Sequence, residues 1–273
     1  MDQFERSGLV FPVQDHGPAD GAAVVLLHGF PQDASSWNQV VPRLTDQGFR
    51  VLVPTQRGYA ATARPLRRAD YHMHEMVGDV LALLDTAGLD RVHLVGHDWG
   101  GAVAWGFAGA WPARLHTLTA LSTPHPGAMV DAMVHSSQAL KSWYMGVFQV
   151  PWLPEQIVSR TLGKSLVDTG LPSADAVRYM AALSEPGALT AALNWYRGMQ
   201  MLSSWRKAPD VAVPTTYIWG DHDFALGRYA AEHTAQHVTA DYTFEPLKAG
   251  HWLPETRPEQ VAAAIVDRAR RAE

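Results

Sequence analysis

The chain has 273 residues, and its 22 basic and 27 acidic side chains give a formal net charge of −5. This small negative charge, without blocks of like charge, excludes an electrostatic nucleic-acid binder, and the absence of cysteine excludes disulfides and thiolate chemistry. No apolar run has the length of a membrane span, and the start M-D-Q-F-E-R lacks the regions of a signal peptide. We therefore expect a cytoplasmic protein without membrane insertion, with one large domain or a core domain carrying an insertion.

Predicted strands and helices alternate through the first 121 residues. Residues 1–20 suit an edge strand and its loop, and the apolar, β-branched run 22–27 is typical of a buried parallel strand. Further along, we expect a helix over 36–47, strands over 50–54, 92–95 and 115–121, a helix over 73–89, and another helix that ends near Trp111-Pro112. This alternation predicts a parallel sheet covered on both faces, with its ligand site beyond the carboxyl ends of the strands.

The alternation stops at Pro124-His125-Pro126 and resumes near residue 213. In the segment between these two points, helical patterns, aromatic residues and prolines indicate a helical lid over the ligand-binding edge of the sheet. A strand over 213–219, a helix over 227–236, a strand over 242–247 and a last helix after Pro258 follow. We therefore predict an N-terminal part of an α/β core (1–125), a helical lid (126–209) and a C-terminal part of the core (210–273).

The stretch L-V-G-H-D-W-G-G contains the pattern small-x-nucleophile-x-small, with Asp98 at the nucleophile position. Side chains at Gly96 and Gly100 would collide with the neighbouring strand or helix at such a tight turn. Asp98 would lie at a helix N-terminus, where partial positive charge favours an anion. An ionised carboxylate is a nucleophile that needs no base to deprotonate it. The alternative is a glycine-rich turn with a helix-capping aspartate.

A nucleophile of this kind needs a base, a group that orients the base, and an oxyanion hole. His251, in A-G-H-W after the last strand, is the candidate base, although a structural loop histidine is the alternative. Gly220-Asp221-His222-Asp223 offers two carboxylates, of which we favour Asp223 as the orienting acid and take Asp221 as a turn-former. The backbone N–H groups of Trp99 and of Phe30, in H-G-F-P, would form the oxyanion hole unless H-G-F-P is an ordinary turn.

Together, the motifs G-H-D-W-G-G, H-G-F-P, R-G-Y and G-H-W, with the acid after the penultimate strand, resemble the epoxide hydrolases of the α/β-hydrolase fold. The resemblance covers essentially the whole chain and implies a mostly parallel, eight-stranded sheet with a helical cap. Haloalkane dehalogenases share the aspartate and the tryptophan that follows it.

The resemblance also implies two lid tyrosines that hydrogen-bond the epoxide oxygen and protonate it as the ring opens. Tyr196, in Asn194-Trp195-Tyr196-Arg197, matches one of them, and Tyr144, ahead of Phe148-Gln149, matches the other. Epoxide opening needs such an acid because its leaving oxygen is a poor leaving group, whereas a halide departs without a proton. The alternative for each tyrosine is a packing role.

The implied function is cofactor-independent hydrolysis of an epoxide to a vicinal diol through an ester on Asp98. We expect a small hydrophobic epoxide and water as partners, with no cofactor and no metal. A haloalkane dehalogenase and a non-catalytic ligand-binding protein are the rival hypotheses, and the aromatic stretch 143–152 leaves a homodimer contact open. The residues expected to line the substrate pocket are His28, Pro31, Trp143, Phe148, Gln149, Trp195 and Trp252.

Overall fold

A single eight-stranded sheet organises the chain, and the computed structural model describes residues 1–198, 205 and 208–272. The strands are β1 (Gln3–Arg6), β2 (Leu9–His16), β3 (Ala23–Leu27), β4 (Arg50–Pro54), β5 (Val92–His97), β6 (Leu115–Leu121), β7 (Thr215–Gly220) and β8 (Tyr242–Leu247). Their order is β1-β2-β4-β3-β5-β6-β7-β8, and every neighbouring pair is parallel except β1–β2 and β2–β4. The predicted eight-stranded, mostly parallel sheet is confirmed.

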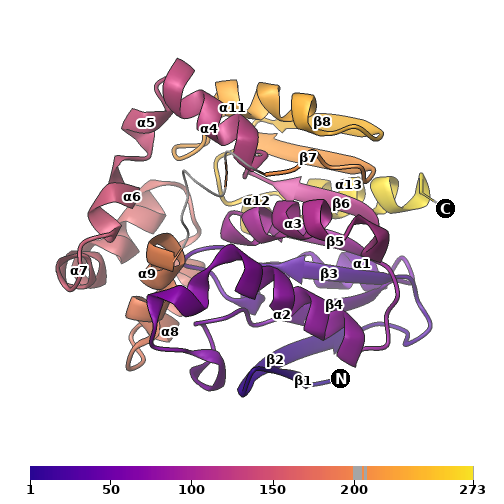
Figure 1. Cartoon of the computed structure of the whole chain (residues 1–273), viewed down its shortest axis with the longest axis horizontal. Coiled ribbons are helices and arrows are strands. Elements are labelled where there is room, and N and C mark those ends of the chain that lie inside the picture. The colour runs from indigo at the N-terminus through magenta and orange to yellow at the C-terminus, as the bar shows by residue number, and fades with distance from the viewer. Residues whose placement is uncertain (199–204, 206–207, 273) are drawn as a thin grey trace.

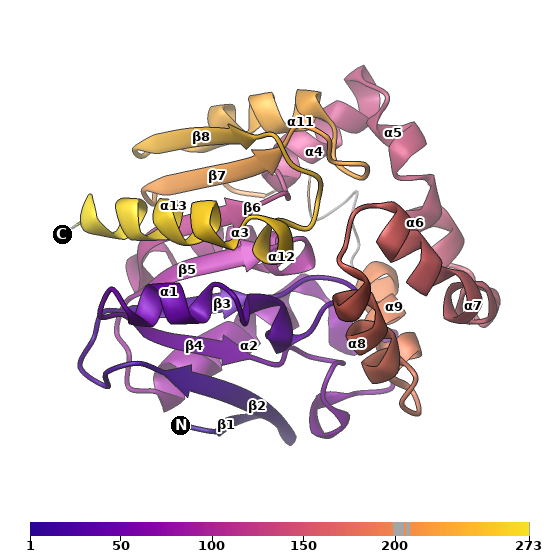
Figure 2. The ribbon, with the colours of Figure 1, turned by 180° about the vertical axis from the view of Figure 1, so that it is seen from behind.

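Helices cover both faces of this sheet (Figures 1 and 2). They are α1 (Val41–Thr45), α2 (Met73–Thr86), α3 (Trp99–Ala110), α4 (Pro126–His135), α5 (Gln138–Lys141), α6 (Trp143–Phe148), α7 (Leu153–Asp168), α8 (Ser173–Leu183), α9 (Ala188–Gly198), α11 (Arg228–His233), α12 (Leu253–Thr256) and α13 (Pro258–Arg270). Helices α1 and α13 lie on one face, and α2 and α3 lie on the other. None of the helices described is both long and apolar enough to cross a membrane.

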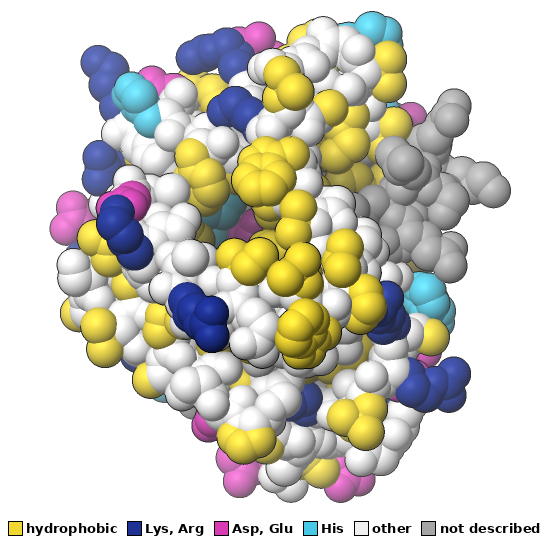
Figure 3. Space-filling model, turned by 90° about the vertical axis from the view of Figure 1, so that its left-hand side faces the viewer, with side chains coloured by type: hydrophobic (Ala, Val, Ile, Leu, Met, Phe, Trp, Pro, Cys, Tyr) yellow, Lys and Arg dark blue, Asp and Glu magenta, His cyan; other side chains and the backbone are white. Residues whose placement is uncertain are grey.

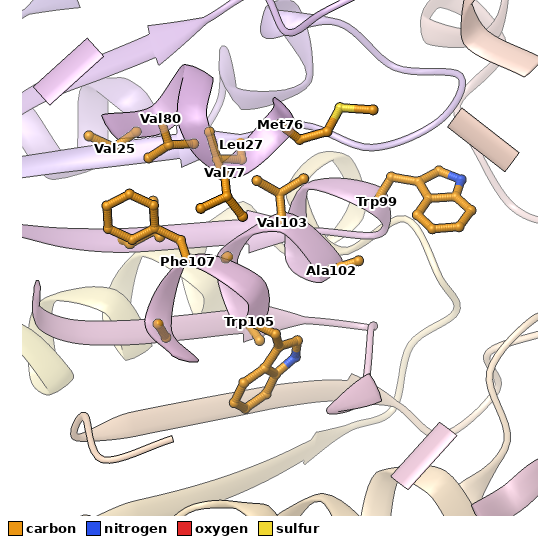
Figure 4. Packing of buried hydrophobic residues seen from close by; sticks show 14 of the residues in the cluster. Val25, Leu27, Met76, Val77, Val80, Trp99, Ala102, Val103, Trp105 and Phe107 are labelled. Atoms are coloured by element: carbon orange, nitrogen blue, oxygen red, sulfur yellow. The ribbon is translucent and has the colours of Figure 1, made fainter. Parts of the chain in front are cut away.

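The central strands are buried along their whole length because both of their faces are covered. All five residues of β3, A-V-V-L-L, are buried, and so are all six of β5. Apolar side chains of α2, α3 and β3 meet in one continuous layer (Figure 4), whereas α1 and α13 pack on the opposite face. The two apolar layers hold the sheet rigid, so the residues at the strand ends have fixed positions.

Two predicted elements differ from the structure. Residues 1–20 form two strands instead of one, because Ser7 and Gly8 adopt positive φ angles of 53° and 77° and turn the chain back on itself. The helix expected over 36–47 is instead a short 3₁₀ helix, Ala34–Trp37, followed by α1. Pro42 lies in the first turn of α1, where the missing N–H is tolerated, so α1 begins there and the longer helix does not form.

Helices α4 to α9 lie between β6 and β7 in the chain, and we call them the insertion helices. Figure 1 shows α6 to α9 at one end of the sheet, opposite the end where both termini lie. Part of the predicted lid segment 126–209 falls outside the described residues, and its boundaries stay a prediction.

A close approach of β3, β5 and α3 surrounds Asp98, and two glycines permit it. A Cβ atom at Gly96 would lie 2.3 Å from the carbonyl oxygen of Gly100. A Cβ atom at Gly100 would lie 2.3 Å from the carbonyl oxygen of Leu27 and 2.5 Å from that of His28. These contacts are with backbone, which cannot rotate away as a side chain can, so both positions require glycine.

We predict that Gly100→Ala destabilises the protein by about 1–3 kcal/mol or more, because the added methyl group forces α3 away from β3. Gly146→Ala is the matched control, since nothing lies within 4 Å of a Cβ atom there in α6. The control should leave stability unchanged or raise it by up to about 1 kcal/mol, as alanine favours helix. Denaturant unfolding measures both, and equal stability of the two variants would contradict the close approach.

Candidate active site

Asp98 lies at the turn between β5 and α3, in a backbone conformation that side chains rarely adopt. Its φ angle is 50° and its ψ angle is −123°. The Thr123 hydroxyl, at the end of β6, donates to the carbonyl oxygen of Asp98 at 2.7 Å. Such strain costs about 1–3 kcal/mol and persists because the surrounding structure compensates for it. It directs the Asp98 carboxylate out of the sheet and into a cavity, where its side chain is 20% exposed.

His251 and Asp223 come together beside this carboxylate. The Nδ1 atom of His251 lies 2.7 Å from Oδ2 of Asp223, and its Nε2 atom lies 3.5 Å from Oδ2 of Asp98. The other oxygen of Asp223 accepts hydrogen bonds from the amides of Ala225 and Leu226, which fix the carboxylate. Asp223 therefore holds the imidazole by a hydrogen bond at Nδ1 and is itself held by two backbone amides.

Two carboxylates make His251 unusually basic. Burial alone lowers the pKa of the imidazole, but the charges of Asp223 and Asp98 and their hydrogen bonds outweigh burial and raise the pKa to about 10. Burial opposes ionisation of Asp98, yet the hydrogen bond and the charge of His251 hold the pKa of Asp98 below its usual value. At neutral pH, the site therefore contains an imidazolium between two carboxylates.

The H-G-F-P turn after β3 contacts Asp98 directly. The backbone amide of Phe30 donates to Oδ1 of Asp98 at 2.8 Å. A Cβ atom at Gly29 would lie 2.4 Å from Cβ of Asp98, so glycine is required for this approach. Trp99 is the first residue of α3, and its amide belongs to the first helical turn, where N–H groups lack intrahelical partners.

Two tyrosines of the insertion helices form part of the cavity wall with Asp98 and Trp99. Tyr144 comes from α6 and Tyr196 from α9, and their ring centroids lie 6.2 Å apart. Burial, reinforced by the negative charge of Asp98, raises the pKa of both hydroxyl groups, so they stay protonated. The cavity therefore has two protonated hydroxyl groups on the side that the insertion helices form.

The remaining wall of the cavity is mostly apolar. Its other lining side chains come from α3, from the loop after β6, from the insertion helices, from the segment after Asp223 and from Trp205, which follows α9 in the chain: Ala102, Thr123, Pro124, Pro126, Met129, Met145, Ala225, Leu226 and Trp205. On the face formed by the insertion helices, hydrophobic side chains surround a hollow in which histidine and acidic side chains are visible (Figure 3). Such a wall suits a small hydrophobic ligand.

Several residues predicted to line the pocket lie elsewhere. His28 is fully buried behind the turn, where its Nε2 atom accepts from the amide of Gln56. The indole of Trp195 donates to the carbonyl oxygen of Arg57, and this bond joins α9 to the R-G-Y turn. These two predictions were wrong for a shared reason: a motif locates a residue in the chain but does not tell which way its side chain points.

The other predicted pocket residues also differ from expectation. The indole of Trp252 donates to Thr169, and the side chain of Trp143 is 68% exposed on the outer face of α6. Pro31 borders a separate depression on the protein. Gln149 donates to the carbonyl oxygen of Tyr196, and the ring centroids of Phe148 and Tyr196 lie 4.9 Å apart. Both residues therefore contact Tyr196 and do not line the cavity themselves.

Sequence patterns did not reveal several lining residues, among them Met129, Met145, Trp205 and Leu226. Leu226 lies three residues after the orienting acid, and that proximity was the available signal for it. Met145 directly follows Tyr144 in the chain. Nothing local distinguishes Met129 or Trp205 from core residues, since apolar side chains at helical spacing serve both roles.

Comparisons with known proteins identify the family of the chain. A model of the alpha/beta hydrolase fold matches residues 22–258, and the chain belongs to this family. An AB hydrolase superfamily protein of Bacillus subtilis, YfhM, is 35% identical over 96% of this chain and 94% of its own length. Epoxide hydrolase A of Mycobacterium tuberculosis is 31% identical over 96% of this chain and 95% of its own length.

A solved structure extends the similarity to three dimensions. The crystal structure of epoxide hydrolase A from Mycobacterium thermoresistibile superposes with a TM-score of 0.85 at 26% identity, and the match covers 98% of this chain and 97% of that one. The predicted resemblance to epoxide hydrolases of the α/β-hydrolase fold is thus confirmed.

We predict that the pKa of His251, measured by NMR titration of the imidazole, is about 10 in the parent protein and lower in Asp98→Asn. Removing a negative charge beside an imidazolium favours the neutral ring, so the pKa should fall by about 1–3. Asp221→Asn is the control and should leave the value unchanged, because Asp221 is not hydrogen-bonded to His251. A pKa of His251 near 6.5 in the parent protein, or an unchanged pKa in Asp98→Asn, would contradict the claim that the two carboxylates raise the pKa of His251.

Proposed function

We propose that this chain hydrolyses epoxides to vicinal diols through an ester on Asp98, with residues 126–209 as a lid on a core made of residues 1–125 and 210–273. One observation carries the proposal: Asp98, paired with His251, lines the same apolar cavity as the hydroxyl-bearing rings of Tyr144 and Tyr196. A nucleophile and two acids on one cavity are what epoxide opening requires. Relatives named epoxide hydrolases support the same conclusion.

In the first half-reaction, an Asp98 oxygen attacks an epoxide carbon. A new C–O ester bond forms, the ring C–O bond breaks, and its electron pair goes to the ring oxygen. Tyr144 and Tyr196 donate hydrogen bonds to that oxygen, and one hydroxyl supplies the proton that makes it an alcohol. The raised pKa of both tyrosines keeps the protons in place until the oxygen gains negative charge.

Formation of the ester then changes the basicity of His251. The carboxylate of Asp98 loses its charge, so one of the two groups that raise the pKa of His251 is removed. The imidazolium can release its proton to the tyrosinate, which restores the acid and leaves a neutral base. His251 therefore becomes a base only after the alkylation that makes a base necessary.

In the second half-reaction, His251 takes a proton from water as the water oxygen attacks the carbonyl carbon of the ester. The amides of Phe30 and Trp99 donate to the resulting oxyanion, and Asp223 stabilises the imidazolium. The intermediate collapses by breaking the bond between this carbon and the diol oxygen, which takes the proton from His251. The diol leaves, and Asp98, which is then a carboxylic acid, passes its proton to His251, so the carboxylate and the imidazolium of the resting site are both regenerated. No cofactor or metal takes part.

We predict that replacing Tyr144 or Tyr196 with phenylalanine lowers the rate of epoxide alkylation about tenfold or more, as expected for one positioned acid. The double replacement should nearly abolish alkylation. Stopped-flow mixing with a panel of small hydrophobic epoxides measures the step. Trp143→Phe is the control, since that ring is exposed and should leave the rate unchanged.

The same variants separate the proposal from its main rival. Halide departure needs no proton, so a haloalkane dehalogenase would not need the tyrosines as acids. Turnover of a chloroalkane or bromoalkane as fast as the best epoxide, and undiminished in the double variant, would contradict the proposed function. Tight binding of an apolar ligand without any turnover would instead favour a binding protein.

A further inference from the structure

Two tyrosines can act on one epoxide oxygen only if the spacing between them is fixed. A hydrogen bond between a hydroxyl group and an oxygen is about 2.5–3.0 Å long, so both hydroxyl groups have to lie within that distance of the same atom. A hydroxyl that donates to the substrate cannot also be anchored by donating to the protein. The spacing of Tyr144 and Tyr196 therefore depends on how α6 and α9, which carry them, are held together.

Arg197, the residue after Tyr196 in α9, joins these two helices. Its side chain is 2% exposed and lies outside the cavity wall that Tyr196 forms. Nε donates to the carbonyl oxygen of Phe148 at 2.8 Å, and Nη2 donates to that of Val150 at 2.9 Å. Phe148 is the last residue of α6, where carbonyl groups lack intrahelical partners. Arg197 therefore binds the end of α6 through its backbone.

A second contact joins the same two helices in the opposite direction. Gln149, which follows α6, donates to the carbonyl oxygen of Tyr196 at 2.8 Å. Since a side chain from each helix binds the backbone of the other, α6 and α9 cannot slide past each other without breaking these bonds. The ring of Phe148 contacts both tyrosines, with centroid distances of 5.5 Å to Tyr144 and 4.9 Å to Tyr196. The link thus lies directly behind the tyrosine pair.

Glu155, in the first turn of α7, holds the guanidinium of Arg197 in this orientation. Nη1 donates to Oε1 of Glu155 at 2.7 Å and Nη2 donates to Oε2 at 3.0 Å, so the pair is bidentate. Burial opposes ionisation of Glu155, yet the hydrogen bonds and the charge of Arg197 hold the pKa of this carboxyl group below its usual value. The carboxylate compensates the positive charge, so Arg197 acts on the tyrosines through geometry.

We propose that Arg197 is a positioning residue for the tyrosine pair: by binding the end of α6 from α9, it sets the spacing at which both hydroxyl groups reach one epoxide oxygen. This inference rests on the proposed function, because the tyrosines act as acids only when the epoxide opens. The orienting acid and the base come from loops of the core and take no part in this link. Loss of the link should therefore slow alkylation and spare ester hydrolysis.

Arg197→Lys tests this proposal. Lysine keeps the positive charge but cannot reproduce the planar fork that binds two carbonyl oxygens and a carboxylate at once. In single-turnover experiments with enzyme in excess, we expect alkylation to slow about tenfold, as for the loss of one positioned acid, and decay of the ester on Asp98 to stay within about twofold. In Tyr196→Phe, one acid remains and the spacing no longer matters, so Arg197→Lys should slow alkylation less than about twofold further.

Arg114→Lys is the matched control. The Arg114 guanidinium also binds two backbone carbonyl oxygens, those of Leu89 and Asp90, and one carboxylate, that of Asp85. It precedes β6 and therefore lies at the opposite end of the parallel strands from Asp98. Its replacement removes bonds of the same kind and should leave the rates of both steps unchanged.

Gln149→Met is a second variant that applies even if Arg197→Lys does not fold, since it removes the bond to Tyr196 and keeps Arg197. Alkylation should slow about threefold or more, as for the loss of one hydrogen bond, with ester hydrolysis unchanged. Equal slowing of both steps, unchanged alkylation, or an undiminished effect of Arg197→Lys in Tyr196→Phe would overturn the positioning role. Failure of the parent protein to form any ester on Asp98 would instead contradict the proposed function, so the two failures are distinguishable.

Discussion

The site depends on one backbone constraint, the close approach of β3, β5 and α3 around Asp98. Carbonyl oxygens of Leu27 and His28 occupy the space that a side chain at position 100 would need. This approach holds Asp98 in its strained conformation and brings the amide of Phe30 within 2.8 Å of its carboxylate. Because both central strands are wholly buried in a dense core, the sheet cannot relax to release the strain. Asp98 is thus positioned by the fold itself.

Electrostatics links the two half-reactions that we propose. One imidazole faces two carboxylates, so its proton affinity depends on whether Asp98 carries charge. In the resting site, the imidazolium stabilises the ionised nucleophile, and after ester formation the same ring becomes a base. Charge balance, more than any single contact, therefore orders the steps.

The sequence predicted that residues at the strand ends come together. Asp98, Asp223 and His251 each follow a predicted strand, and parallel strands bring their carboxyl ends to one edge. The direction in which a side chain points could not be predicted from its place in the sequence. Trp143 and Trp195 were therefore assigned to a pocket that they do not line. Hydrogen bonds between residues far apart in the sequence could not be predicted either. Gln32 and Glu255, for example, are 223 residues apart, and no local pattern indicates that they are hydrogen-bonded.

The most direct test of the account follows the oxygen atom that Asp98 transfers. With enzyme in excess over epoxide in heavy-oxygen water, the account predicts that the diol from the first turnover contains no solvent oxygen. The heavy oxygen should appear instead in the peptide that contains Asp98, as mass spectrometry would detect. A diol labelled from solvent in that first turnover, with Asp98 unlabelled, would show that water attacks the epoxide directly and would contradict the ester on Asp98.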